Sequence, residues 1–202
     1  MTTDRPARKF ALSSAEHRTS LAARGRAEVM LRLCRARGQE LQMTGRPYFY
    51  EGWPIIRAEG PILLGEECRL RGGPVRSRFV ARSSGRIEIG AHAGFNFGAE
   101  VYSELGITIG DYSSIGPFVT IYDTSFHPVD EGGKVHAAPV EIGENVWIGR
   151  QVLILPGVTI GEHSVVASGA IVTRDIPPRT LVAGNPARPL REVKASDGWR
   201  RM

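Results

Sequence analysis

The chain has 202 residues and a hydrophobic content of 42%, enough for one folded domain. Its net charge of +5 comes from residues 1–40, which hold nine Lys and Arg against four Asp and Glu, so the rest of the chain is neutral and no nucleic-acid surface is expected. No apolar run reaches the roughly 20 residues of a membrane span, and residues 1–20 lack the apolar core of a signal peptide, so a cytoplasmic location is expected.

The N-terminal quarter of the chain is predicted to be a cap. Residues 1–12 are polar and predicted to be disordered. Ser13 or Ser14 can cap a helix that runs to about Arg37 and stops at Gly38, within a basic helical segment over residues 13–50. Its Arg-rich face is either solvated or makes a weak contact with an acidic partner or an anionic membrane surface.

The stretch from Ile142 to Ile176 repeats every six residues. Each unit opens on a branched aliphatic residue, at Ile142, Ile148, Ile154, Ile160, Val166 and Val172. A period of six fits neither a helix nor an ordinary strand. It is typical of a solenoid in which each unit makes one strand and one corner, and three units complete a triangular coil. The sequence therefore predicts an all-β solenoid over residues 51–188, of roughly six or seven coils, followed by a tail at residues 189–202.

One segment, the loop over residues 122–139, breaks this period. A solenoid has no interior cavity, so its chemistry must come from loops and from surfaces between subunits. The loop contains His127, whose imidazole can accept a proton near neutral pH. His127 is therefore the candidate catalytic base. His92 and His163 stand in the middle of hexapeptides and are expected to be surface residues.

A metal site is the alternative use of these histidines. Zinc needs three or four converging ligands. His127 and His136 are well separated in sequence, and Cys34 and Cys68 lie outside any metal-ligand spacing. No metal is therefore expected, and both cysteines are interpreted as reduced thiols.

Several motifs between Ile87 and Val193 point to a known family. They are His127-Pro128, the run from Ile142 to Gly149, the run from Pro156 to Gly161, and the segment from Ala183 to Arg188. With these motifs the chain resembles the hexapeptide-repeat acyltransferases, in particular the sugar O-acetyltransferases of the galactoside, maltose and nodulation type. The resemblance implies a left-handed parallel β-helix, acetyl-CoA as acyl donor, and a homotrimer with active sites at subunit interfaces.

The resemblance also implies roles for individual residues. His127 would take the proton from an acceptor hydroxyl, and Asn96 would lie beside that hydroxyl or else turn a corner of the coil. The backbone N–H of Arg150 would bind the oxyanion, although the family has a small residue there. Coenzyme A would lie along the later coils, over Trp147, Gly149, Arg150, Ser168, Thr173, Arg174, Arg188 and Arg191. Trp147 could instead pack at a subunit contact, and the arginines could form a solvated face.

The acceptor side is less fully specified. Glu104 matches an acidic sugar contact, Phe126 flanks His127, and Asp123 either orients His127 or turns the loop. Three functions remain: O-acetylation of a sugar, polysaccharide unit or sugar-containing natural product; N-acetylation of an amino sugar, nucleotide sugar or antibiotic; and a carbonic-anhydrase-like or non-catalytic solenoid.

Overall fold

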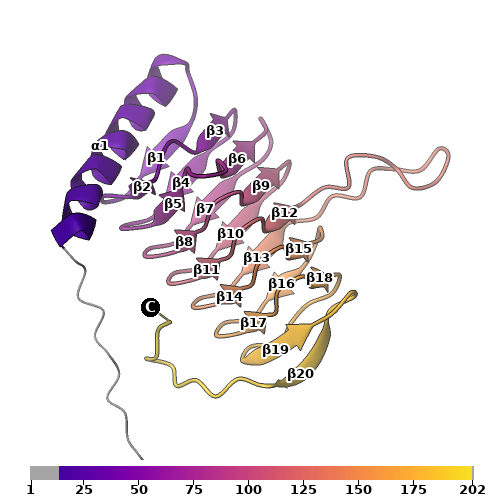
Figure 1. The fold of residues 1–202 in the computed structure, drawn as a ribbon. Coiled ribbons are helices and arrows are strands. Elements are labelled where there is room, and N and C mark those ends of the chain that lie inside the picture. The colour runs from indigo at the N-terminus through magenta and orange to yellow at the C-terminus, as the bar shows by residue number, and fades with distance from the viewer. Residues whose placement is uncertain (1–13, 202) are drawn as a thin grey trace, which may run out of the picture.

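The protein is a left-handed parallel β-helix with one helix at its N-terminal end. The six-residue period predicts the solenoid, and the resemblance predicts its left hand. The computed structural model describes residues 14–201, so the prediction for residues 1–12 lies outside it. Figure 1 shows the helix against the first coils, the strands stacked in rungs, and a long arm that projects from the stack between β12 and β13.

Three sheets, parallel apart from the last strand of the second, form the three walls of the solenoid. The first sheet contains β1 (Leu41–Met43), β4 (Ile62–Leu64), β7 (Ile87–Ile89), β10 (Ile107–Ile109), β13 (Val140–Ile142) and β16 (Thr159–Ile160). The second contains β2 (Tyr48–Tyr50), β5 (Arg69–Arg71), β8 (Gly94–Phe95), β11 (Ser114–Ile115), β14 (Trp147–Ile148), β17 (Val165–Val166), β19 (Thr180–Ala183) and β20 (Arg188–Glu192). The third contains β3 (Ile55–Ala58), β6 (Arg78–Ala81), β9 (Glu100–Ser103), β12 (Thr120–Tyr122), β15 (Leu153–Ile154) and β18 (Ile171–Val172).

The core is a set of aliphatic columns that run along the solenoid axis. Successive strands pair in register, so that Ile109 stacks on Ile142 and Ile142 on Ile160. All three side chains are at most 2% exposed. Because side chains alternate across a strand, the residue between two core positions points outward. The sixfold repeat therefore fixes which side chains are available on the surface.

One corner of the coil is turned by residues with left-handed backbone conformations. His92, Tyr112, Asn145 and His163 have φ angles of 59°, 57°, 54° and 59° and follow one another from coil to coil. The backbone N–H of each donates to a carbonyl in the preceding coil, for example His163 to Glu144 at 2.9 Å. This corner becomes important because the C-terminal tail lies across it.

Helix α1 (Ser14–Ala36) covers the first coils, close to its predicted bounds. It buries small and medium side chains, Ala23, Ala27, Met30 and Cys34, beside β1 and β2. Two of its arginines turn inward, since Arg24 donates to the Tyr48 hydroxyl and Arg26 donates to the Phe49 carbonyl at 2.7 Å. Arg32, Arg35 and Arg37 remain exposed. The contact with an anionic surface stays a prediction. No helix within residues 14–201 is long and apolar enough to cross a membrane.

The coil begins earlier than residue 51, the predicted boundary. Strands β1 and β2 lie inside the predicted cap segment and pair in parallel with β4 and β5. At the other end, β20 lies in the predicted tail and pairs antiparallel with β19. Residues beyond β20 then run back along the molecule toward earlier coils (Figure 1).

Candidate functional site

Five of the predicted site residues lie together in an open groove along the second sheet. Asn96, Trp147, Gly149, Arg150 and Ser168 line it, together with Ser114. In-register stacking explains the grouping, because Ser114 pairs with Trp147 on the outer face while Ile115 and Ile148 pair on the inner face. Trp147 is 51% exposed within the chain. A large apolar side chain so exposed, beside a small serine, forms a flat apolar wall for a ligand or a partner.

The side-chain oxygen of Asn96 already accepts a hydrogen bond. Its Oδ1 accepts a hydrogen bond from the backbone N–H of Phe97 at 2.9 Å. The Nδ2 group is therefore the half left to donate to a ligand in the groove. Asn96 does not adopt a left-handed backbone conformation, so it is not the residue that turns a corner of the coil by that conformation.

Gly149 is required by the stacking of the coils. A β-carbon at this position would lie 2.6 Å from the backbone nitrogen of Ser168 in the next coil. The adjacent N–H of Arg150 donates to Ser168 Oγ at 3.1 Å, so the predicted oxyanion donor has an acceptor within its own chain. The Arg150 guanidinium lies over the Phe118 ring, 5.0 Å from its centroid, which accommodates the bulk that departs from the family pattern.

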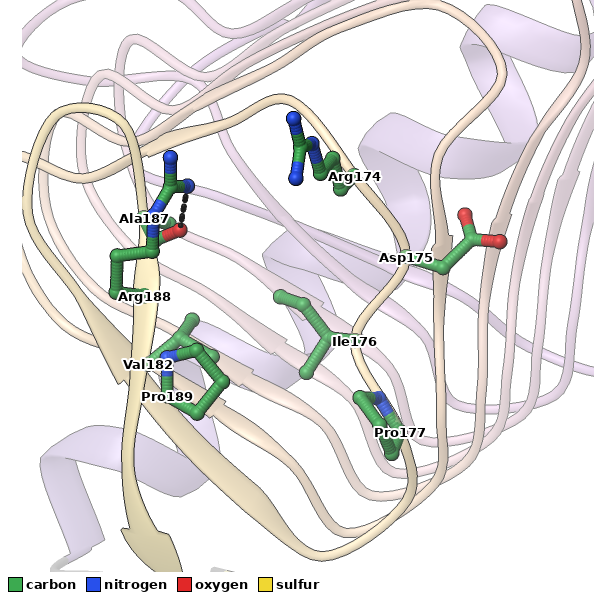
Figure 2. A pocket seen from close by; sticks show the side chains of 8 residues that line it. All are labelled: Arg174, Asp175, Ile176, Pro177, Val182, Ala187, Arg188 and Pro189. Carbon is green, nitrogen blue, oxygen red and sulfur yellow. Dashed lines mark hydrogen bonds between the residues drawn. The ribbon is translucent and has the colours of Figure 1, made fainter.

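The remaining coenzyme candidates lie near the last coil and do not all converge. Arg174 and Arg188 line a second pocket with Ile176, Val182 and Pro189. Figure 2 shows the two guanidinium groups at one end of this pocket, with Asp175 pointing away from it. Asp175 accepts instead from the backbone N–H of Thr159 at 2.8 Å.

Arg191 and Thr173 do not line this second pocket. Arg191 donates to the Glu192 carbonyl at 2.9 Å, and Thr173 is exposed.

The arm carries His127 away from the groove. An antiparallel bridge between Thr124 and Ala137 closes its base. The peptide N–H of His127 donates to the Ser125 carbonyl at 2.7 Å, and the Ser125 hydroxyl donates to the His127 carbonyl at 3.0 Å. The His127 side chain is exposed and makes no hydrogen bond to any residue in the range 14–201. Within one chain, His127 and Asn96 therefore do not form a common site.

The structure corrects the predicted role of Asp123 as a substrate contact. Its side chain is 0% exposed and turns into the solenoid. The carboxylate accepts from the Ser103 hydroxyl and from the backbone N–H groups of Glu104, Leu105 and Gly106, at 2.7 to 2.8 Å. With these donors around it, Asp123 neither reaches an acceptor nor orients His127. It fixes the turn after β9 and the start of the arm.

Glu104 and Phe126 lie where the arm leaves the solenoid, as part of a cluster that the sequence did not indicate. Glu104 accepts from the Tyr102 hydroxyl at 2.7 Å. Phe126 packs against Tyr102 and Tyr122, with ring centroids 4.9 and 5.2 Å away. Burial, followed by hydrogen bonds to Glu104 and Glu100 respectively, raises the pKa of Tyr102 and of Tyr122 to about 12. The available signal was two tyrosines at matching positions of successive coils.

His163 was predicted to be a surface residue and is buried, with 2% exposure. The C-terminal tail covers it. The Arg201 guanidinium donates to the His163 carbonyl at 2.8 Å, and the side-chain amide of Asn145 contacts His163 Nδ1, also at 2.8 Å. Asn145 itself is 0% exposed and binds the Trp199 carbonyl and the Arg201 N–H. The six-residue repeat gives no indication that the C-terminal tail folds back over this corner.

The histidines and acids of the described residues do not form a metal site. Across residues 14–201, no three of the His, Cys, Asp or Glu side chains are grouped so as to hold a metal ion. Cys34 and Cys68 are both free and buried. Burial raises the pKa of the Cys68 thiol to about 12, which keeps it protonated and unreactive.

Comparison with known proteins agrees with this architecture. Residues 139–174 match the family described as bacterial transferase hexapeptide (six repeats). Nodulation protein L of Rhizobium meliloti (strain 1021) is 45% identical over 142 residues, which cover 68% of this chain and 74% of that protein. The chain belongs to the hexapeptide-repeat acyltransferases, in the group that contains the galactoside and nodulation acetyltransferases.

Other relatives match over a smaller share of their length. Galactoside O-acetyltransferase of Escherichia coli (strain K12) is 44% identical over 115 residues, 55% of this chain and 56% of that protein. The chain thus aligns with little more than half of that relative.

Two solved structures share the fold. A hexapeptide-repeat acetyltransferase of Vibrio cholerae O1 biovar eltor, complexed with acetyl coenzyme A, is 29% identical, with a TM-score of 0.54 over 91% of this chain and 92% of that one. The N-acyltransferase AntD of Bacillus cereus, at 21% identity, has a TM-score of 0.64 over 81% of this chain and 89% of that one.

Proposed function

We propose that the protein transfers an acetyl group from acetyl-CoA to a hydroxyl of a sugar or a sugar-containing acceptor. The names of the relatives from Rhizobium meliloti and Escherichia coli, and the acetyl coenzyme A bound to the structural neighbour from Vibrio cholerae, support this assignment. The observation that carries it is a groove with an amide donor and an exposed indole, on a chain that also presents an exposed imidazole on its arm.

The chemistry is a direct transfer between two bound substrates. His127 removes the proton of the acceptor hydroxyl as its oxygen attacks the thioester carbonyl. The tetrahedral intermediate collapses with cleavage of the C–S bond, and the protonated imidazole returns its proton to the departing coenzyme A thiolate. No acyl-enzyme is needed, because holding both substrates in one cleft removes much of the entropic barrier.

The groove residues supply orientation and charge stabilisation. Asn96 Nδ2 donates to the acceptor oxygen, since its Oδ1 is held by Phe97. The Arg150 N–H binds the developing oxyanion in place of Ser168 Oγ, which is its present acceptor. In this proposal Trp147, in the groove, flanks the pantetheine arm, and Arg174 and Arg188, in the second pocket, pair with phosphate groups of the coenzyme.

The complete site requires a second subunit. His127 lies on an arm that projects from the stack, whereas the groove follows β8, β11 and β14 (Figure 1). We infer a homotrimer in which the arm of one subunit reaches the groove of its neighbour. Cyclic symmetry would then build three equivalent sites from one chain. The exposed indole of Trp147 supports a partner on this face.

The proposal is tested by replacing each of the two histidines of the arm with alanine in a separate variant. His127→Ala should lower kcat/KM by about 10²–10⁴-fold, the usual contribution of a general base. His136→Ala, an exposed control on the same arm, should leave it within about twofold. Thiol release and product mass are followed over a panel of sugars and amino sugars. Undiminished turnover by the His127→Ala variant would show that His127 is not the general base. Turnover of amine acceptors alone would show that the enzyme is an N-acetyltransferase and not an O-acetyltransferase.

A further inference from the structure

The root of the arm rests on three aromatic side chains, Tyr102, Tyr122 and Phe126, which we call the aromatic cluster. All three rings are in mutual contact, with centroids 4.9 to 6.2 Å apart and mostly edge-to-face. Tyr102 and Tyr122 come from β9 and β12 and pair in register. Phe126 comes from the arm and directly precedes His127. The cluster therefore joins the rigid coils to the segment that carries the proposed base.

Carboxylates that interact with arginines lie near both tyrosines. Tyr102 donates its hydroxyl to Glu104 at 2.7 Å. Arg82 in turn approaches Glu104 at 4.0 Å and pairs with Glu59 at 2.7 Å. Glu100, whose carboxylate contributes to the raised pKa of Tyr122, pairs with Arg78 at 3.2 Å. The Tyr102 ring is thus fixed at its hydroxyl end, and both tyrosine rings contact Phe126.

The backbone around Phe126 makes this contact decisive for His127. Phe126 has a φ of 61°, an uncommon conformation for a bulky residue, and its N–H donates to the Thr124 hydroxyl at 3.2 Å. Phe126 is itself 42% exposed but keeps its contacts with both tyrosine rings, whereas residues 127–136 are exposed and make no aromatic contact with the coils. Phe126 is therefore the last side chain before His127 that packs on the solenoid, and its direction determines how the arm leaves.

We propose that Phe126, Tyr102 and Tyr122 are positioning residues that aim His127, and that Phe126 is not an acceptor contact. The role rests on the proposed function of His127 as base. The aromatic cluster acts on the catalytic step through arm geometry, because a displacement of about 1 Å can cost on the order of 100-fold in rate. An acceptor contact would instead act through binding.

The kinetic test separates these two roles. Phe126→Ala and Tyr122→Ala should lower kcat by roughly 10- to 100-fold, with KM for the acceptor nearly unchanged. Phe126→Tyr and Tyr122→Phe, which keep the rings, should recover most of kcat. Val129→Ala is the matched control, since Val129 lies on the same arm and is 93% exposed. A rise in KM at constant kcat for Phe126→Ala would overturn the proposal and make Phe126 an acceptor contact.

A second measurement does not depend on activity. Lys134 is the sole Lys or Arg between residues 123 and 139, so tryptic cleavage after Lys134, followed by mass, reports the freedom of the arm. Phe126→Ala should accelerate this cleavage several-fold relative to Val129→Ala and the unmodified chain. Equal cleavage rates would overturn the positioning role. If His127→Ala retained full activity while Phe126→Ala still loosened the arm, the proposed function would fail and the anchoring would stand.

Discussion

The Asp123 carboxylate accepts a hydrogen bond from the Ser103 hydroxyl at 2.8 Å, between two coils and with both residues 0% exposed. Three backbone N–H groups complete its shell. A residue at the root of the arm thus serves the coil and not the proposed chemistry. It holds the turn from which the arm starts.

This relationship predicts a stability effect. Asp123→Asn replaces one acceptor oxygen by an NH₂ group that faces existing donors, so the free energy of unfolding should fall by about 1–3 kcal/mol. Urea denaturation followed by circular dichroism measures it. Asp130→Asn, on the exposed arm, is the control and should change stability by less than about 0.5 kcal/mol. Equal midpoints for the two variants would contradict the structural role of Asp123.

Subunit mixing should restore activity. His127→Ala and Asn96→Ala should each be nearly inactive alone, because each removes one half of every site. If arm and groove come from different subunits, each mixed trimer would regain one of its three active sites, or about a third of them. Co-expression with two affinity tags isolates the mixed species for assay. Mixed trimers as inactive as the parents would place both residues of a site on one subunit.

Removal of the tail should uncover His163. Deletion of residues 196–202 takes away the partners that Trp199 and Arg201 provide to Asn145 and His163. The free energy of unfolding should fall by about 1–3 kcal/mol, since the Asn145 side chain loses its hydrogen bonds to Trp199 and Arg201. Diethyl pyrocarbonate should then modify His163 several-fold faster, read by mass. His136, exposed with or without the tail, calibrates the reagent. Unchanged modification of His163 would contradict the covering role.

The aromatic cluster predicts a loss of stability at alkaline pH. The pKa values of Tyr102 and Tyr122 are raised from 10.0 to about 12. The folded protein therefore holds these protons more tightly than the unfolded chain does. Their contribution is fully present below pH 10.0 and is lost as pH rises through about 12. The free energy of unfolding, measured by urea titration across this range, should fall less steeply for a Tyr102→Phe, Tyr122→Phe double variant. Parallel slopes would contradict the shifted pKa values.

The sequence was sufficient for the solenoid because the repeat is local. Each six-residue unit from Ile142 to Ile176 predicts one strand and one corner by itself. The stacking of coils then determines only the register between strands. The first strands were harder to predict, since β1 and β2 lack the Gly-containing six-residue pattern of the later coils. Handedness and family followed from motif resemblance and not from the period.

The candidate site was predictable only in part. Asn96, Trp147, Gly149, Arg150 and Ser168 converge because hexapeptide spacing places them on one wall. The burial of His163 depends on a tail more than thirty residues further along the chain. The inward turn of Asp123 depends on donors from the preceding coil. Such long-range packing leaves no mark on local sequence pattern.

The closed base of the arm has an evolutionary consequence. Thr124 and Ala137 bridge its two ends, and the Ala138 N–H donates to the Asp123 carbonyl at 2.9 Å, so the coil continues as though the intervening residues were absent. Insertions or deletions between these ends would leave the register of every later rung intact. The arm can therefore vary in length and sequence while the stacking of the coils is kept.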